Sequence, residues 1–297
     1  MNYGAYEQYK PSGVAWLDSV PSHWKVKAAR HGYSIQLGKM LQPDSSSPAD
    51  VETVYLKSQH VQWESVRVDD LPLMWASPTD IKKYGVSDSD LLVCEGGDVG
   101  RAGIIKDTPP NTIIQNALHR VRPRSQHDIR FLMYVLEHAT GQSWFEIICN
   151  RSTIAHFTGE KFDALLVPEP PFDEQQTIVC FLDAKAAQID ALIWQKRQLI
   201  DKLREMRNTL IARTVTRGLP PIAAKAEGLN PAPEMKDAEA DWLDQLPKHW
   251  QILPMTKYLS DMSDYRGKTP DKTADGVFLV TARNVRMGFI DYECSQE

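Results

Sequence analysis

The feature that most constrains this chain is its longest stretch without glycine or proline, which runs from Asp173 to Arg217. Gly218 and two prolines just after it end the stretch. Asp173 is placed to accept hydrogen bonds from a first helical turn, and Gln176, three residues later, has the spacing of a capping box. The stretch therefore predicts one helix over residues 173–217, roughly 65 Å long.

Apolar side chains recur along this predicted helix at alternating spacings of three and four residues. This period of 3.5 is the coiled-coil pattern, whose apolar stripe needs a second helix to cover it. The alternative is a long helix that packs on its own domain, and the lengths of the flanking segments disfavour it. The stripe consists of Ile189, Leu192, Lys196, Leu199, Leu203, Met206 and Leu210, with Lys196 as its one charged member.

Charge is distributed unevenly along the chain. The net charge of −5 does not by itself indicate a nucleic-acid-binding protein. Residues 196–217, however, contain seven Lys or Arg against Asp201 and Glu205, whereas residues 218–250 are acidic. Local surfaces are therefore more informative than total charge about a partner such as DNA.

The cysteine and hydrophobicity patterns exclude several classes of protein. No two cysteines have CxxC spacing, so we expect reduced, mostly buried thiols rather than a disulfide framework or a zinc site. Residues 1–15 are polar, unlike a secretory signal, and the longest apolar run, residues 131–136, is too short to cross a bilayer. We expect a cytoplasmic protein without a membrane segment. The cysteines are Cys94, Cys149, Cys180 and Cys294.

An internal repeat indicates that the chain is built from duplicated modules. The nine residues Trp16–Trp24 recur as Trp242–Trp250, at an offset of 226 (242 − 16), and six of the nine are identical. A weaker similarity links residues 54–61 to residues 277–285. Two tryptophans in each copy make a chance match improbable, so we predict two modules of one kind.

The repeat divides the chain into segments. We expect a first module over residues 1–172, the helix over 173–217, a linker over 218–240 and an incomplete second module over 241–297. The second copy has room for only the opening part of a module. Either the sequence is a fragment of a longer protein, or the natural gene stops early.

The first module combines many short strand-like runs with few helices, which predicts an α+β fold. A loop rich in Ser, Pro and Asp over residues 42–50 separates two of these regions. The expected strands cover residues 51–61, 66–68, 90–94, 104–105, 115–124 and 162–168, and the expected helices cover residues 78–84 and 129–140.

A glycine-rich segment, Glu95–Gly103, follows the expected strand over residues 90–94. Glycines after a strand raise the hypothesis of a nucleotide-binding enzyme, in which a phosphate-binding loop leads directly into a helix. A strand and the pair Pro109–Pro110 follow here instead, and the chain contains no GxxxxGK[ST] motif. We favour a β-turn in which glycine lets the backbone approach a neighbour closely.

Motifs of DNA-modifying or DNA-cleaving enzymes are absent from the sequence. There is no Asn/Asp-Pro-Pro-Tyr, and the pair Glu234 and Lys236 lies in a Pro/Ala-rich segment without a preceding paired acid. Cys149 and His156 are a candidate thiol–imidazole pair, but two such residues seven apart are more often unrelated. We therefore expect no catalytic residue, no metal site and no cofactor in this chain.

Several patterns together resemble the specificity subunit (HsdS type) of type I restriction–modification systems. Each module opens with WLxxxPxHW, and residues 167–175 have the sequence Val-Pro-x-Pro-Pro-x-x-Glu-Gln that leads into the helix. Residues 189–218 fit IDALI…LIxxLxExRxxLIxxxVTxG, and residues 100–103 form a GRxG turn. The resemblance covers nearly the whole chain and is most specific in the helix and its lead-in.

This resemblance implies a non-catalytic recognition subunit of a methyltransferase and endonuclease complex. Each module would be a target recognition domain that reads one half of a split double-stranded DNA site. The helix would pair antiparallel with its counterpart and dock two modification subunits, which carry S-adenosylmethionine, while restriction subunits supply ATP-driven cleavage. This chain departs from the pattern because it lacks most of the second module and the second helix. Two copies associating through residues 173–217 would restore the two-fold arrangement.

Side chains that read bases must reach a groove edge, and Gln, Asn, Arg, Lys and His supply suitable donors and acceptors. We expect these residues on one hairpin, at the glycine turn and on two further segments. Arg101 is the strongest single candidate for a phosphate contact, because Gly100 and Gly103 clear space around it. The DNA-binding candidates are Lys57, Gln59, His60, Gln62, Arg101, Gln115, Asn116, Arg151, Ser152 and His156.

A second interpretation is a truncated assembly or scaffold remnant, whose helix still binds partner subunits but whose modules read no DNA. The two interpretations differ in one observable property. Only a recognition subunit binds DNA in a sequence-specific and salt-sensitive manner.

Overall fold

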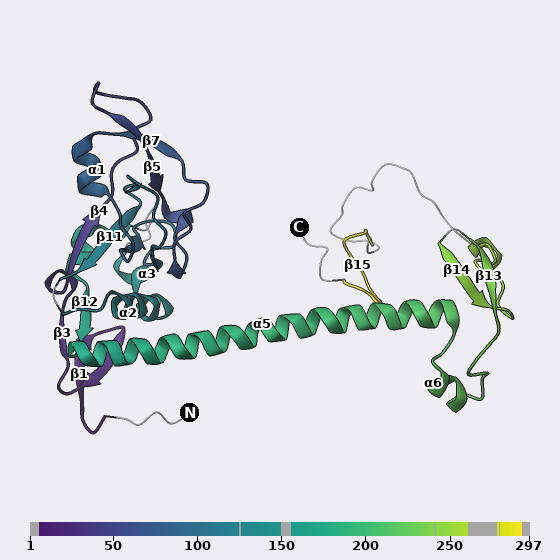
Figure 1. Cartoon of the computed structure of the whole chain (residues 1–297). Coiled ribbons are helices and arrows are strands. Elements are labelled where there is room, and N and C mark those ends of the chain that lie inside the picture. Colours follow the sequence, from purple (N-terminus) through teal and green to yellow (C-terminus); the bar gives the residue numbers. More distant parts are fainter. Residues whose placement is uncertain are drawn as a thin grey trace. The chain divides into compact units, whose positions relative to one another are not determined.

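The computed structural model contains the predicted long helix, α5, as one unbroken element from Phe172 to Arg217 (Figure 1). It ends before Gly218, whose φ of +87° is the left-handed conformation that glycine commonly adopts after a helix. The structure describes residues 6–124, 126–149, 156–240, 242–260, 278 and 280–292. The chain forms two compact units, Met1–Gln198 and Leu199–Glu297.

The beginning of α5 differs by one residue from the prediction. The backbone N–H groups of Glu174 and Gln175 both donate to the carbonyl of Pro171 at 3.0 Å. Asp173 therefore lies inside the first turn, and the prediction that it caps the helix is wrong. Its carboxylate remains close to the positive end of the helix dipole, where negative charge is favourable.

The first unit is built around a five-stranded sheet with the strand order β4-β11-β8-β9-β6. Its pairs are antiparallel except the last, in which β6 runs parallel to β9. The predicted apolar strand, β8, lies at the centre with all four residues buried. The strands are β4 (Tyr33–Leu37), β6 (Glu64–Ser65), β8 (Leu91–Cys94), β9 (Ala102–Ile104) and β11 (Leu118–Pro123).

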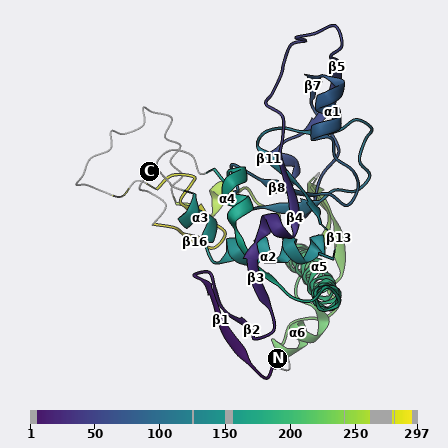
Figure 2. The ribbon, with the colours of Figure 1, turned by 90° about the vertical axis from the view of Figure 1, so that its left-hand side faces the viewer.

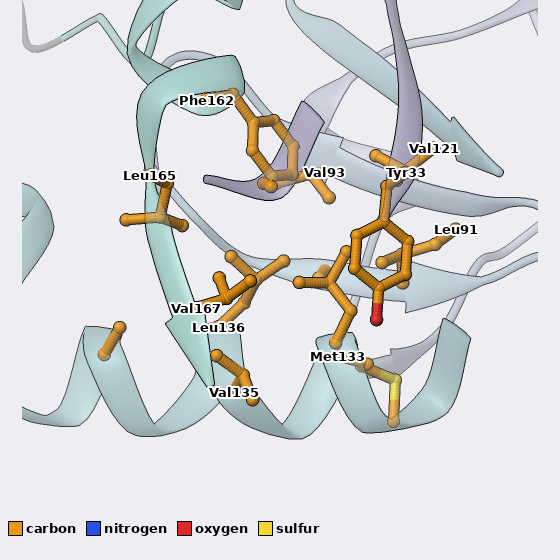
Figure 3. Close-up of a cluster of buried hydrophobic side chains, with 14 of the residues drawn as sticks. Tyr33, Leu91, Val93, Val121, Met133, Val135, Leu136, Phe162, Leu165 and Val167 are labelled. Carbon is orange, nitrogen blue, oxygen red and sulfur yellow. The ribbon is translucent and has the colours of Figure 1, made fainter. Parts of the chain in front are cut away.

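Helix α2 (Ile129–Gly141) packs on this sheet and forms the main core of the module (Figure 3). Asp128 caps the helix by accepting hydrogen bonds from the N–H groups of Arg130 and Phe131. Each large side chain buried here contributes about 1.5–3 kcal/mol of transfer free energy. The core includes Tyr33, Leu91, Val93 and Val121 from the sheet, Met133, Val135 and Leu136 from α2, and Phe162, Leu165 and Val167.

A smaller sheet of three strands, in the order β10-β5-β7, has its own core against helix α1. α1 spans Pro78–Tyr84, the bounds predicted from the sequence. Ser77 caps it by accepting a hydrogen bond from the N–H of Asp80, and Pro78 occupies the first helical position, where its missing N–H costs nothing. The strands are β5 (Val51–Leu56), β7 (Leu73–Ala76) and β10 (Ile113–Ile114).

Three predicted strands are wrong, at least in part. The strand predicted over residues 66–68 is absent: β6 ends at Ser65, and Val66 forms only an isolated bridge with Val61. The run 51–61 is a strand only as far as Leu56, and a 3₁₀ turn, η2 (Ser58–His60), follows it. Residues 162–168 are divided between a helix, α4 (Gly159–Ala164), and the strand β12 (Leu166–Glu169). Phe162 stabilises the helix, because its buried ring packs against Phe157. The remaining elements here are β3 (Lys25–Ala28), η1 (Ala29–His31) and α3 (Trp144–Ile148).

The first module holds the beginning of α5 through polar contacts with α2. Gln175 is buried and accepts a hydrogen bond from the N–H of Asp128 at 2.9 Å. Asp183 accepts hydrogen bonds from Arg130 and from the Tyr134 hydroxyl, both at 2.7 Å. These contacts fix the first turns of the helix to the core of the module.

A hairpin of β1 (Tyr9–Val14) and β2 (Leu17–Pro21) completes the first module (Figure 2). It buries Trp16, whose ring centroid lies 5.9 Å from that of His138 on α2. Trp16 therefore anchors the hairpin to the core of the first module.

The second unit contains a hairpin that repeats the first at the offset of 226. Its strands, β13 (Met235–Ala240) and β14 (Leu243–Pro247), have the pairing register and the bulge position of β1 and β2. The sequence repeat therefore corresponds to a structural repeat. The predicted linker over residues 218–240 contains α6 (Pro221–Ala226) and this first strand.

The other described elements of the second unit are short. They are η3 (Met255–Lys257), β15 (Val285–Arg286) and β16 (Phe289–Ile290). The weaker similarity over residues 277–285 lies partly outside the described residues. Among the helices of the described ranges, none combines the length and apolar character needed to cross a membrane.

Candidate nucleic-acid interface

Three segments that carry predicted DNA contacts meet at one edge of the first module. The guanidinium of Arg101 donates to the carbonyl of Ser58 at 3.1 Å, which joins the glycine turn to η2. The N–H of Gln115 donates to the carbonyl of Leu56 at 2.9 Å, which places residues 115–117 beside the same turn. Residues 57–67, 95–101 and 115–117, which we call the loop surface, are therefore neighbours although they are distant in sequence.

The first segment of the loop surface presents two glutamines to solvent. Gln59 and Gln62 are exposed, and Lys57 is half-buried. Lys57 and Gln59 lie at or on η2 rather than on the predicted hairpin, because the strand ends at Leu56. Gln62 follows η2, and its backbone N–H donates to the carbonyl of Ser65 at 2.8 Å. Arg67, which the sequence analysis missed, reaches back and donates to the carbonyl of Gln59 at 3.1 Å. The signal that could have identified Arg67 from the sequence is that it lies close to the candidates Gln59 and Gln62.

His60 has a structural role in this turn. It is 3% exposed, and its Nδ1 accepts a hydrogen bond from the N–H of Lys57 at 3.0 Å. Burial lowers the pKa of His60, and the positive charges of Lys57 and Arg67 lower it further. A neutral, enclosed imidazole stabilises the turn, and so its predicted place among the groove-reaching side chains does not fit the geometry.

Arg101 holds two parts of the loop surface together. Its side chain is 19% exposed and pairs with Asp98 as well as with the carbonyl of Ser58. The charge that the prediction assigned to a phosphate is therefore largely compensated within the module. Few N–H groups of the Arg101 side chain therefore remain exposed and available to a phosphate.

The neighbouring glycines serve close packing rather than access to Arg101. A Cβ at Gly100 would lie 2.5 Å from the ring of Phe145, and a Cβ at Gly103 would lie 2.3 Å from the carbonyl oxygen of Ser65. The prediction that they clear space around Arg101 is wrong, but the expected close backbone approach is confirmed.

The third segment places Gln115 and Asn116 half-buried beside η2. The N–H of Asn116 donates to the carbonyl of Lys39 at 2.9 Å, and Gln115 forms a parallel bridge with Lys39. Gly38 permits this approach, because a Cβ there would lie 2.2 Å from the Gln115 carbonyl oxygen. The backbone of this segment is therefore held in a fixed position.

His156 lies at the border of the loop surface and is exposed. Its Nδ1 is 2.9 Å from a carboxylate oxygen of Glu95. The N–H of Glu95 in turn donates to the carbonyl of Ala117, which connects this ion pair to the third segment. The two other candidates of this region, Arg151 and Ser152, lie outside the described residues.

Three hypotheses about enzyme-type sites can be compared with the described residues. Strand β9 follows the glycine turn directly, so the nucleotide-binding hypothesis, which requires a helix there, is wrong. Cys149 is fully buried, and burial raises the pKa of its thiol, which disfavours a reactive thiolate. No group of three potential ligands for a metal ion occurs within the part of the chain that the structure describes.

A comparison with protein families matches a region that contains two of the three segments of the loop surface. Residues 77–202 match the family model described as "Type I restriction modification DNA specificity domain". The match covers less than half of the chain, and it shows that residues 77–202 are similar to this specificity domain. The matched range includes the glycine turn, α2 and the first part of α5, so the predicted resemblance to a specificity subunit is confirmed. A search of curated proteins found no match.

One solved structure of a type I system supports a similar fold, and two further structures align less closely. A chain from a study of complex assembly and conformational transition of the type I R-M system has a TM-score of 0.51 at 16% identity, covering 69% of this chain and 48% of that one. The HsdS subunit from Thermoanaerobacter tengcongensis aligns at 18% identity with a TM-score of 0.44, covering 62% and 41%. The S subunit from M. genitalium aligns at 16% identity with a TM-score of 0.36, covering 64% and 45%. The first comparison supports the α+β fold with a long helix, and this chain spans about half of that relative.

Past its first turns, helix α5 is exposed to solvent. Every residue from 187 to 213 is exposed, including Lys196. The six apolar members of the predicted stripe are between 47% and 67% exposed. Soluble helices rarely leave such a stripe without a partner, because burying each large apolar side chain is worth about 1.5–3 kcal/mol. The stripe consists of Ile189, Leu192, Lys196, Leu199, Leu203, Met206 and Leu210.

Proposed function

We propose that this chain is a non-catalytic, cytoplasmic DNA-recognition subunit of a type I restriction–modification complex. Its first module would read one part of a split double-stranded DNA site through the loop surface. The observation that carries this proposal is the match of residues 77–202 to the DNA specificity domain family. S-adenosylmethionine would belong to the modification subunits and ATP to the restriction subunits, so this chain needs no cofactor of its own.

The loop surface offers the groups that this reading requires. An exposed glutamine amide presents one donor and one acceptor, the pair that adenine complements in the major groove. Gln59 supplies one such amide on the η2 turn, which His60 and Arg101 hold in place. Gln62 supplies another just after it, and one hydrogen of its amide bonds the Gln59 carbonyl at 3.3 Å. Lys57 and Arg67 form no ion pair with a carboxylate of the described residues, and both are suited to phosphate contacts.

The uncovered stripe of α5 would dock another helix. Exposed apolar residues at a 3.5-residue period fit a coiled-coil partner rather than a sheet or a loop. In the complex this partner would come from modification subunits or from the α5 helix of a second copy. The seven Lys or Arg of residues 196–217, of which Lys196 lies in the stripe and the others beside it, favour an acidic partner surface.

The proposal is tested by selecting duplexes from a randomised library with the chain mixed with its modification subunits. We expect enrichment of one sequence motif and affinity that falls steeply with salt. Replacing Gln59 and Gln62 with Ala should relax the motif, since each good base contact is worth about 1–3 kcal/mol of discrimination. The control is Lys82→Ala, an exposed residue on α1 that lies outside the loop surface.

A second pair of substitutions separates phosphate contacts from base contacts. Lys57→Ala and Arg67→Ala should each reduce the slope of log affinity against log salt by about 0.9, while the selected motif stays the same. Binding without any enriched motif, or no binding, together with retained association to modification subunits, would favour the scaffold interpretation instead.

A further inference from the structure

The second hairpin repeats a pair of hydrogen-bond donors that have a defined task in the first copy. In the first copy, the Nε2 of His23 lies 2.9 Å from one carboxylate oxygen of Glu174, and the indole N–H of Trp24 donates to the other at 3.0 Å. The hydroxyl of Tyr6 donates to the same carboxylate. Glu174 lies in the first turn of α5, so these donors clamp the start of the helix to the hairpin.

The second hairpin keeps the backbone that positions this donor pair. The N–H of Trp24 donates to Pro21 at 2.9 Å, and that of Trp250 donates to Pro247 at 2.8 Å. The pairing register before this turn is also the same in both copies. His249 and Trp250 therefore leave their hairpin in the same way as His23 and Trp24, although the counterpart of Tyr6 is an alanine.

No carboxylate occupies this donor pair within the described part of the second unit. The ion pairs described there join Lys248 to Glu234 and Arg286 to Asp291. His249 is exposed, and the ring of Trp250 lies beside Gly218, where a Cβ would be 4.0 Å from its Cζ2. The pair is thus located next to the end of α5.

We propose that His249 and Trp250 form a carboxylate clamp for the start of a second helix. An indole N–H and an imidazole N–H side by side match the two oxygens of one carboxylate, and bonds to a charged acceptor are the strong ones. The first copy identifies the occupant: a helix start preceded by two prolines, with a glutamate in its first turn, like Pro170–Glu174. A helix held there would begin beside the end of α5.

The occupant differs from the α5 start of a second copy of this chain. Glu174 of any copy already accepts hydrogen bonds from its own Tyr6, His23 and Trp24. A carboxylate has about four lone-pair positions, so little capacity remains for two more donors. The clamp therefore fits another helix start of the same type, and it is independent of whether the first module reads DNA.

A peptide with the sequence of residues 166–190 tests the clamp in the full chain. The peptide contains Glu174 but ends before most of the apolar stripe, so its binding depends neither on helix pairing nor on DNA. In a ¹H–¹⁵N spectrum of the eight tryptophan indoles, we expect the Trp250 resonance, assigned with Trp250→Phe, to shift as peptide is added. Trp250→Phe, His249→Gln and a peptide with Glu174→Gln should each weaken binding at least about tenfold.

Lys248→Ala is the matched control, because this exposed residue lies on the same turn and pairs with Glu234 instead. Its affinity for the peptide should equal that of the parent chain. The proposal is overturned if no indole shifts at about 1 mM peptide, the range of weak binding. It is equally overturned if Trp24 shifts in place of Trp250, or if the Glu174→Gln peptide binds as tightly as the original.

Discussion

The first hairpin (β1–β2) and the second hairpin (β13–β14) share one pairing register, yet equivalent tryptophans have opposite surroundings. Trp16 is 6% exposed in the core of the first module, whereas Trp242 is 77% exposed. The hairpin geometry therefore follows from its own sequence. Its burial depends on elements that arrive later in the chain, namely α2 and the start of α5.

This difference divides the molecule into covered and uncovered apolar surface. The first turns of α5 and the first hairpin are covered by one complete module. Trp242 of the second hairpin and residues 187–213 of α5 are exposed, although Leu246 of the same hairpin is buried. Uncovered surface of this kind marks interaction sites more often than it marks defects.

The largest effect on stability is expected from truncating the covered tryptophan. Trp16→Ala removes a buried indole from the main core and should lower the free energy of unfolding of the first module by about 3–5 kcal/mol. Trp242→Ala at the matching position should change it by no more than about 0.5 kcal/mol. Urea denaturation followed by circular dichroism measures both. Equal costs would show that the two hairpins are packed alike.

A smaller effect is expected at the clamp of the first copy. Burial alone would raise the pKa of Glu174, but hydrogen bonds from Tyr6, His23 and Trp24 outweigh it, so the pKa is lowered. The resulting stabilisation is present above the ordinary glutamate pKa of 4.5 and is lost as the pH falls through the lowered pKa of the folded state.

Glu174→Gln should therefore cost about 1–2 kcal/mol at pH 7, and the difference from the parent chain should shrink below pH 4.5. Glu169, whose pKa is also lowered because its bonds to Lys27 and His127 outweigh burial, retains its own acid dependence in both proteins. Denaturation of the two proteins at several pH values measures the difference. A difference that stays constant down to pH 3 would contradict the clamp.

The smallest effect is expected at the surface of the second hairpin. Lys248 and Glu234 form an ion pair at 2.6 Å, but both side chains are largely exposed. Exposed pairs contribute little because water and salt screen them. Lys248→Ala should therefore leave thermal unfolding unchanged within error, and a clear loss would indicate that this hairpin is covered in solution.

Local sequence patterns predicted the elements whose causes are local. The helix over residues 173–217, the α1 bounds and the hairpin repeat depend on periodicity, capping and turn residues, all of which are visible in sequence. Contacts across the fold decided the rest. His60 is buried at η2, Arg101 bonds to Ser58 across the fold as well as to nearby Asp98, and Phe162 lies in a helix that packs on the core.

For the loop surface, the sequence predicted which segments take part better than it predicted which side chains are free to bind. Segments around Lys57, Arg101 and Gln115 do converge, because strand pairing brings their loops to one edge. Which of their side chains remain free depends on partners elsewhere in the fold, and the bond of Arg67 to the Gln59 carbonyl shows that Arg67 belongs to this surface.

The most direct measurement is the association state of Leu199→Glu/Leu203→Glu, determined by sedimentation with and without modification subunits. Two carboxylates in the exposed stripe should abolish association, and the circular dichroism of the first module should be unchanged, since neither side chain contacts its core. The control, Gln198→Glu/Asn208→Glu, adds the same charge outside the stripe and should associate as the parent chain does. If the stripe variant associates with the same affinity as this control, the central claim is contradicted, namely that the exposed stripe of α5 binds another helix.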